Sequence, residues 1–167
     1  MRVLKIFLIL ALAFGLAACG GREKSKFRTY KGPEVTSVQV HKSQRKMYLL
    51  HGNQALKVYD IGLGFMPVGH KQFEGDGKTP EGTYYMTFKN PNSRYHLSLL
   101  VNYPNGNDKA FAESQGKRPG GDIFIHGGPR RPTSVRDWTE GCIAVTDDEI
   151  EEIYSMVRVG TPIHVLP

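Results

Sequence analysis

Residues 123–144 read IFIHGGPRRPTSVRDWTEGCIA and contain a histidine and a cysteine separated by a loop. The apolar run Ile123–Ile125 predicts a short strand that ends at His126, where Gly127 begins a turn. Cys142 follows in a polar, glycine-containing segment, which argues against a role as simple core filling. We interpret His126 and Cys142 together as the candidate catalytic centre.

The chemistry that suits this pair is nucleophilic attack on a carbonyl. A thiol attacks as the thiolate, so it needs a neighbouring base or a positive potential, and His126 can supply both. Gly141 lacks a Cβ, which allows the backbone before Cys142 to turn tightly and to aim amide N–H groups at an oxyanion. Thr139 offers either a hydroxyl donor or a turn residue. No carboxylate is placed to orient His126, so a backbone carbonyl is expected in that role.

Metal and nucleotide chemistry fit the sequence poorly. The chain has no HExxH motif, no paired CxxC and no second cysteine near Cys142, so no zinc site is expected. The segment Gly62-Leu63-Gly64 lacks the following glycine, lysine and helix of a nucleotide-binding loop. The formal charge of +6 comes from scattered basic residues without the aromatic interleaving of a nucleic-acid surface. Acidic polymers or anionic lipid headgroups are the expected partners.

Three segments occur in a telling order: Gly75–Tyr84 (GDGKTPEGTY), Ile125-His126-Gly127 and Thr139–Ala144 (TEGCIA). They resemble the L,D-transpeptidase (YkuD-type) family signature, in which a Thr-Pro-x-Gly-x-aromatic turn is followed by a His-Gly pair and a Ser/Thr-x-Gly-Cys block. The resemblance covers residues 35–166. It implies a mainly β (β-rich α+β) domain, sandwich-like or barrel-like, with one well-signalled helix near the C-terminus.

The same resemblance implies a peptidoglycan-modifying cysteine acyl transferase that needs no metal and no other cofactor. Such enzymes attack the stem tetrapeptide at its third residue, release D-alanine and hold the tripeptide as a thioester, which an amine or water then resolves. Carried over by position, Cys142 is the nucleophile and His126 is the proton donor and acceptor. The backbone amides of Gly141 and Cys142 become the oxyanion donors.

Two positions depart from the commonest form of the family motif, which has histidine before the glycine and arginine two residues after the cysteine. Here they are Glu140 and Ala144, and the Gly-Cys-Ile-Ala form is similar to a subgroup that includes hydrolases. Transpeptidation, carboxypeptidation and release of a wall-linked lipoprotein therefore all remain open. So does a catalytically silent, peptidoglycan-binding lipoprotein.

The substrate-binding residues are predicted from chemistry and position. Arg136, with Arg130 or Arg131 as alternatives, is expected to replace the missing arginine, because guanidinium groups bind carboxylates in bidentate fashion. Thr139 and Gly127 are predicted to contact the substrate as well.

Outside these motifs the chain alternates strand-like segments with turns. Alternating β-branched and aromatic residues predict strands at 38–40, 47–50, 56–61, 83–88, 96–101, 123–125 and 163–166, the first three as an antiparallel meander. Thr146–Glu149 is a capping box that opens a helix with an apolar stripe, which Gly160 and Pro162 end. Residues 62–82 and 104–121 are too rich in glycine, proline and charge for regular structure.

The N-terminal residues predict export and lipidation. Residues 1–18 combine two basic residues with an apolar run and predict a signal peptide, and Leu16–Gly20 (LAACG) resembles a bacterial lipobox that would lipidate Cys19. Residues 19–34 are expected to be a flexible tether, and residues 35–167 the catalytic domain. The lipid would hold the protein at the periplasmic face of a membrane, the outer membrane rather than the inner. Lipidation of Cys19 would leave Cys142 as the only thiol of the folded domain.

Overall fold

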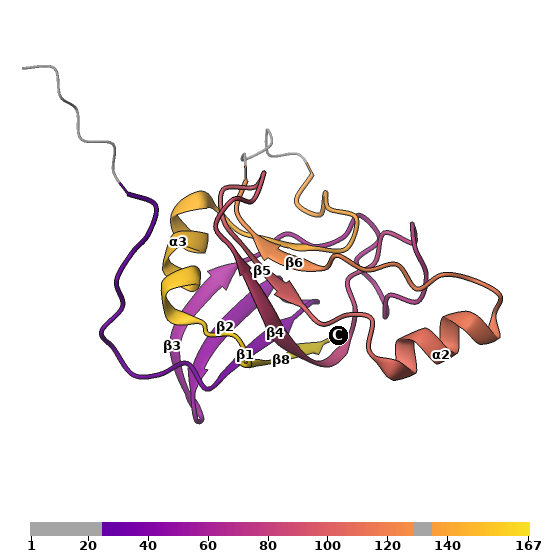
Figure 1. Cartoon of the computed structure of the whole chain (residues 1–167), viewed down its shortest axis with the longest axis horizontal. Coiled ribbons are helices and arrows are strands. Elements are labelled where there is room, and N and C mark those ends of the chain that lie inside the picture. The colour runs from indigo at the N-terminus through magenta and orange to yellow at the C-terminus, as the bar shows by residue number, and fades with distance from the viewer. Residues whose placement is uncertain (1–24, 129–134) are drawn as a thin grey trace, which may run out of the picture.

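The computed structural model describes residues 25–128 and 135–167, which form one strongly curled β-sheet with two helices (Figure 1). The strand order is β3-β2-β1-β8-β4-β5-β6-β7. The strands are β1 (Ser37–His41), β2 (Lys46–His51), β3 (Gln54–Asp60), β4 (Gly82–Asn90), β5 (Ser98–Val101), β6 (Phe124–His126), β7 (Ile143–Ala144) and β8 (Pro162–Leu166). The helices are α2 (Gly106–Ser114) and α3 (Asp147–Met156), which lie on opposite sides of the view. The predicted mainly β class, the β1-β2-β3 meander and the helix near the C-terminus are confirmed.

Strand β4 joins the two halves of the sheet. Its first residues pair antiparallel with β8, and its last residues pair antiparallel with β5, with an irregularity between Met86 and Phe88. A bulge of this kind bends the strand and increases the local twist. The resulting curl turns strands β5, β6 and β7 toward the β1-β2-β3 meander.

The chain directly after β3 closes the curl against the other edge of the sheet. Gly62 and Ala144 exchange two backbone hydrogen bonds of 2.9 Å, and the N–H of Thr139 donates to the carbonyl of Leu63 at 3.1 Å. A Cβ on Gly62 would lie 2.5 Å from the carbonyl oxygen of Arg136, so only glycine permits this approach. These contacts fix the segment that carries Cys142 to the chain that follows β3.

The core fills the inside of the curl. Alternating residues of the strands are buried there, and Ile150 and Ile153 enter from α3. The helix begins at the predicted capping box: the Thr146 hydroxyl accepts the N–H of Glu149 at 3.3 Å, and the Glu149 carboxylate accepts the N–H of Thr146 at 2.8 Å. A cap of this type contributes about 1 kcal/mol to helix stability.

Helix α2 corrects the prediction that residues 104–121 lack regular structure. Asn105 caps it by accepting the N–H groups of Asn107 and Asp108 at 2.9 and 3.1 Å, while the Asp108 carboxylate accepts the N–H of Asn105 at 2.8 Å. Only Asp108 and Ala112 of this helix are buried. A helix with so small an apolar face shows no clear 3.6-residue period, which is why the pattern missed it.

The other segment predicted to be irregular, residues 62–82, contains no helix or strand before β4 begins at Gly82, and side chains hold it in place. Lys42 has an exposed fraction of only 2%, and its ammonium group donates to the carbonyls of Gly69 and Thr79 and to the Glu81 carboxylate at 2.6 to 2.9 Å. These three bonds account for the buried charge, because a buried ammonium is tolerated only when its donors are paired.

The described part of the predicted tether, residues 25–34, has no regular structure but is held against the domain. Arg28 forms ion pairs with Asp148 and Glu151 of α3, and Lys26 donates to two backbone carbonyls near the end of β4. Charged side chains thus connect these residues to the domain in this structure, and the flexibility expected of residues 19–34 stays a prediction. Cys19 and the predicted signal peptide lie outside the described residues. In the part of the chain that is described, no helix has the length and apolar character to cross a membrane.

Candidate active site

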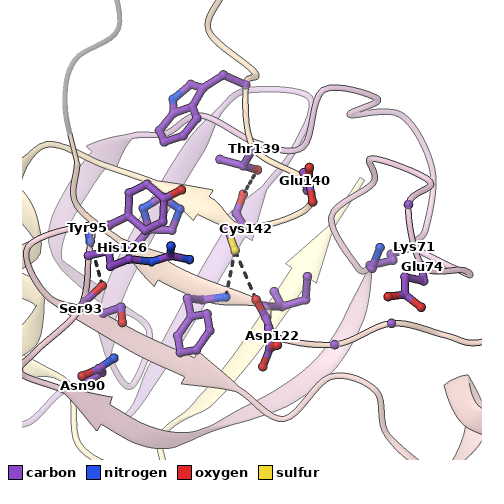
Figure 2. Close-up of a pocket in the computed structure, with 18 of the residues that line it drawn as sticks. Lys71, Glu74, Asn90, Ser93, Tyr95, Asp122, His126, Thr139, Glu140 and Cys142 are labelled. Atoms are coloured by element: carbon purple, nitrogen blue, oxygen red, sulfur yellow. Dashed lines mark hydrogen bonds between the residues drawn. The ribbon is translucent and has the colours of Figure 1, made fainter.

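Strands β6 and β7 bring His126 and Cys142 onto one face of the sheet. The two strands are parallel, with Ile125 opposite Ile143, so Cys142 falls beside Phe124. The N–H of Phe124 donates to the Cys142 sulfur at 3.4 Å, which confirms this placement. Neighbouring strands lie about 4.8 Å apart and side chains two residues apart share a face. Cys142 and His126 therefore project into the same hollow (Figure 2).

His126 is oriented by its own backbone neighbourhood. The ring is buried, with an exposed fraction of 3%, and its Nδ1 lies 2.5 Å from the carbonyl oxygen of Gly127. A carbonyl can only accept, so Nδ1 carries the proton and Nε2 is left as the acceptor. Burial lowers the pKa of His126, and the bond to Gly127 opposes this effect only in part. The imidazole is therefore neutral near pH 7 and able to take a proton, with a backbone carbonyl as its orienting group, as expected.

Two aromatic side chains enclose His126. The Tyr95 ring lies 4.4 Å from the imidazole and the Trp138 ring 5.7 Å from it, measured between ring centroids. Tyr95 and Trp138 also contact each other, at 6.0 Å. Sequence reasoning did not select either residue, because Tyr95 precedes β5 and meets His126 only when β5 pairs with β6.

The thiol of Cys142 is neutral in this environment. It donates to the carbonyl of Asp122 at 3.4 Å and accepts the N–H of Phe124. Burial raises the pKa of Cys142 and is the largest effect. The hydrogen bond from the Phe124 N–H lowers this pKa by less, and the nearby charges of Asp122 and Lys71 have still smaller effects that raise and lower it, respectively. The resting site thus holds a neutral thiol beside a neutral imidazole, so a base must remove the proton during attack.

Thr139 braces the turn that presents Cys142. Its hydroxyl donates to the carbonyl of Cys142 at 2.7 Å and accepts the N–H of Gly141 at 3.2 Å. Gly141 has φ = +134°, and a Cβ at this position would lie 2.6 Å from the carbonyl oxygen of Lys78. The single hydroxyl proton of Thr139 bonds to the backbone here, which makes Thr139 a positioning residue; it also lines the cleft, so its predicted substrate contact stays a prediction. The Gly141 N–H as an oxyanion donor stays a prediction, because in the free protein it bonds to Thr139.

The site opens into a cleft of about 790 Å³ that is strongly charged. Lys71 and Arg94 supply positive charge, and Glu74, Asp122 and Glu140 supply negative charge. The Lys71 ammonium is 3% exposed and donates to the carbonyl of Phe73 and to Asp76 at 3.0 and 2.9 Å. Arg94 is exposed, and within residues 25–128 and 135–167 its guanidinium forms no hydrogen bond or ion pair. Among these residues no three or more His, Cys, Asp or Glu side chains gather as a metal site.

Two predicted substrate-binding residues lie elsewhere. The Arg136 guanidinium donates to Asp60 at 3.0 Å and to the carbonyl of Ile61 at 3.2 Å, so it binds the end of β3 and does not line the cleft. Gly127 does not line the cleft either. A Cβ on it would lie 2.7 Å from the Asp147 carboxylate, and its carbonyl serves His126. In this structure both positions are used by the protein's own packing, and a substrate contact by either residue stays a prediction. Arg130 and Arg131 lie outside the described residues.

Comparisons with known proteins agree with this architecture. A family model of the L,D-transpeptidase catalytic domain (YkuD) matches residues 36–165. YafK of Escherichia coli (strain K12), a candidate L,D-transpeptidase, is 31% identical over 166 residues, which cover 93% of this chain and 62% of YafK. The chain thus spans less than two thirds of this curated relative.

Solved structures show the same fold. The helical cell shape determining protein Pgp2 from Campylobacter jejuni has a TM-score of 0.62 at 27% identity, covering 86% of this chain and 51% of Pgp2. An L,D-transpeptidase from Mycobacterium smegmatis has a TM-score of 0.54 at 17% identity, covering 80% of this chain and 59% of that enzyme. At the latter identity the likeness concerns the fold alone.

Proposed function

Because the chain belongs to the YkuD family of L,D-transpeptidase catalytic domains, we propose that it is a cysteine acyl transferase of peptidoglycan with Cys142 as its nucleophile. One observation carries the proposal. The only thiol of the described residues shares a cleft with an imidazole whose Nδ1 proton is held by a backbone carbonyl. The proposed substrate is the stem tetrapeptide, attacked at the carbonyl of its third residue, with D-alanine as the leaving group.

The proposed first half-reaction uses the neutral pair. Nε2 of His126 accepts the thiol proton while the Cys142 sulfur attacks the carbonyl carbon. The oxyanion that forms accepts from the Cys142 amide, and from the Gly141 amide once its bond to Thr139 opens. His126 then delivers its proton to the departing nitrogen of D-alanine, which leaves a thioester on Cys142.

The second half-reaction determines whether the enzyme is a transpeptidase or a hydrolase. An amine of another stem would resolve the thioester by transpeptidation, and water would resolve it by hydrolysis. Hydrolysis is the second candidate, because the Gly-Cys-Ile-Ala form, with Ala144 where the commonest motif has arginine, resembles a subgroup that includes hydrolases. Carboxypeptidation and release of a wall-linked lipoprotein are both hydrolytic forms of this chemistry.

Substrate recognition is proposed to rest on the opposed charges of the cleft. Arg94 takes the role that the sequence had suggested for Arg136, because its guanidinium is exposed at the cleft and able to bind a carboxylate of the stem peptide. Asp122 and Glu140 lie near Cys142 and suit an ammonium group, such as the side chain of a diamino acid.

The proposal is tested with the purified protein and tetrapeptide muropeptides, followed by mass spectrometry. Crosslinked dimers indicate transpeptidation, and bare tripeptide indicates carboxypeptidation. If neither forms, wall material carrying a linked lipoprotein is the next substrate. A carbapenem should add one adduct to the wild-type protein and none to Cys142→Ala. A folded wild-type protein that takes up no adduct and converts no substrate would leave the silent binding protein as the better description.

We also propose that Cys19 is lipidated and that the lipid holds the protein at the periplasmic face of the outer membrane. The support is the LAACG sequence after an apolar run. Cys19→Ser should move the protein from the membrane fraction to the soluble fraction of the envelope. A protein that stays with the membranes would remove Cys19 as the anchor.

A further inference from the structure

The residues before the domain reach the rim of the active-site cleft. We call residues Ser25–Arg28 the strap and residues Asn90–His96 the cleft loop. The Lys26 ammonium donates to the carbonyl of Pro91 at 2.6 Å and to that of His96 at 3.2 Å. These two carbonyls bracket residues 92–95, all of which line the cleft. One side chain of the strap therefore holds both ends of the loop.

A second strap residue reaches the same loop through α3. The Arg28 guanidinium donates to the Glu151 carboxylate at 2.9 and 2.7 Å. The other oxygen of that carboxylate lies 2.9 Å from Nε2 of His96. The Glu151 side chain is only 11% exposed, so this shared carboxylate is largely shielded from solvent. Phe27 adds a ring contact to Tyr154 of α3, at 6.2 Å.

The cleft loop needs such support because its backbone is strained at His96. This residue has φ = +68°, a conformation that side chains with a Cβ rarely adopt and that persists only where surrounding contacts hold it. The adjacent residue is Tyr95, whose ring lies against His126. The contacts thus run without a gap from the strap, through His96, to the ring that buries the catalytic imidazole.

We propose that the strap is a positioning element of the active site. Lys26 and Arg28 hold the cleft loop so that Tyr95 stays against His126, keeps it dehydrated and keeps its Nε2 aimed into the cleft. The idea rests on the proposed function, in which His126 is the base. It also explains why charged residues outside the β-sheet carry several contacts to one loop. The Arg28 side chain is 34% exposed, so the loss of its ion pairs should cost little global stability and act mainly on the loop.

The test compares Lys26→Ala/Arg28→Ala with Arg158→Ala in the full chain. Arg158 is a matched control, because it forms an exposed ion pair with Glu34, six residues after the strap. Within the described part of the chain, no side-chain hydrogen bond or ion pair joins Arg158 to the cleft loop. The first readout is the fluorescence of Trp138, the only tryptophan of the chain, which lies against both Tyr95 and His126. The second is the pH dependence of Cys142 acylation by a carbapenem.

The double variant should change the Trp138 emission and raise the pH at which it titrates, because a hydrated His126 protonates more readily. Acylation at neutral pH should fall about tenfold, as expected when a reacting group is misplaced by part of an ångström. The thermal midpoint should match that of Arg158→Ala. Arg28→Lys, with Lys26 intact, should recover part of the acylation rate by restoring the charge at Glu151.

Equal emission, equal titration and equal acylation rates in the double variant and the Arg158→Ala control would overturn the proposal. Its failure is distinguishable from failure of the proposed function. If the wild-type protein is not acylated at all, the proposed function fails, while the Trp138 titration still reports whether the strap controls the surroundings of His126.

Discussion

Replacing Thr139 by valine should separate the support of the nucleophile from the nucleophile itself. The substitution keeps the shape of a side chain that is only 4% exposed, but it removes the hydroxyl. The N–H of Gly141 then loses its acceptor at 3.2 Å, and the carbonyl of Cys142 loses its donor at 2.7 Å. A buried polar group without a partner costs about 1–3 kcal/mol. With two groups affected, the free energy of unfolding should fall by about 2–6 kcal/mol.

The matched variant is Thr139→Ser, which keeps both hydrogen bonds and loses one methyl group, at a cost of about 1 kcal/mol. Urea unfolding measures the stability of both variants, and stopped-flow carbapenem labelling measures acylation of Cys142. We expect Thr139→Val to acylate about 10- to 100-fold more slowly than Thr139→Ser, because the sulfur is no longer held in its attacking position. Equal rates would refute the bracing role. A faster rate in Thr139→Val would show instead that releasing the Gly141 N–H supplies a missing oxyanion donor.

Three further predictions follow from the charges of the site and its surroundings. Since burial lowers the pKa of His126 and the base must be neutral, the acid limb of the pH profile of acylation should lie below the ordinary histidine value of 6.5. A limb at or above that value would contradict a buried base. His126→Ala should reduce acylation by about 10²–10⁴-fold. Arg94→Ala should raise the KM for tetrapeptide muropeptide about tenfold or more, since a hydrogen bond to a charged group contributes about 1.5–3 kcal/mol. Arg136→Ala should leave this KM unchanged, and the opposite ranking would restore Arg136 as the carboxylate ligand. Lys42→Met should lower the free energy of unfolding, measured by chemical denaturation, by about 3–5 kcal/mol, because it leaves the Glu81 carboxylate without its partner. A decrease below about 1 kcal/mol would show that water replaces the ammonium group.

The neutral resting state of the site has a practical consequence for reactivity. A raised pKa of Cys142 makes the thiol a weak nucleophile toward small reagents at neutral pH. Reaction then depends on a substrate that places its carbonyl where His126 can take the proton during attack. Selective acylation by a bound substrate, rather than general thiol reactivity, is the behaviour that this arrangement favours.

The features that the sequence by itself determined are local. A short strand at His126, a glycine before Cys142 and the capping box at Thr146 are patterns of neighbouring residues. The structure contains all three, with the strand shifted by one residue so that it includes His126. Such patterns can be recognised in the sequence because the geometry of a turn, a helix cap or a short strand depends on a few neighbouring residues.

Only the tertiary structure decided which distant residues share the site. Tyr95 reaches His126 because β5 pairs with β6, and Arg94 reaches the cleft with it. Arg136 was chosen for its chemistry and its nearness in sequence, yet the bridge between Gly62 and Ala144 brings it to the end of β3 instead. Strand pairing joins residues far apart in the chain and leaves no periodic trace at either one, so no local pattern could have located them.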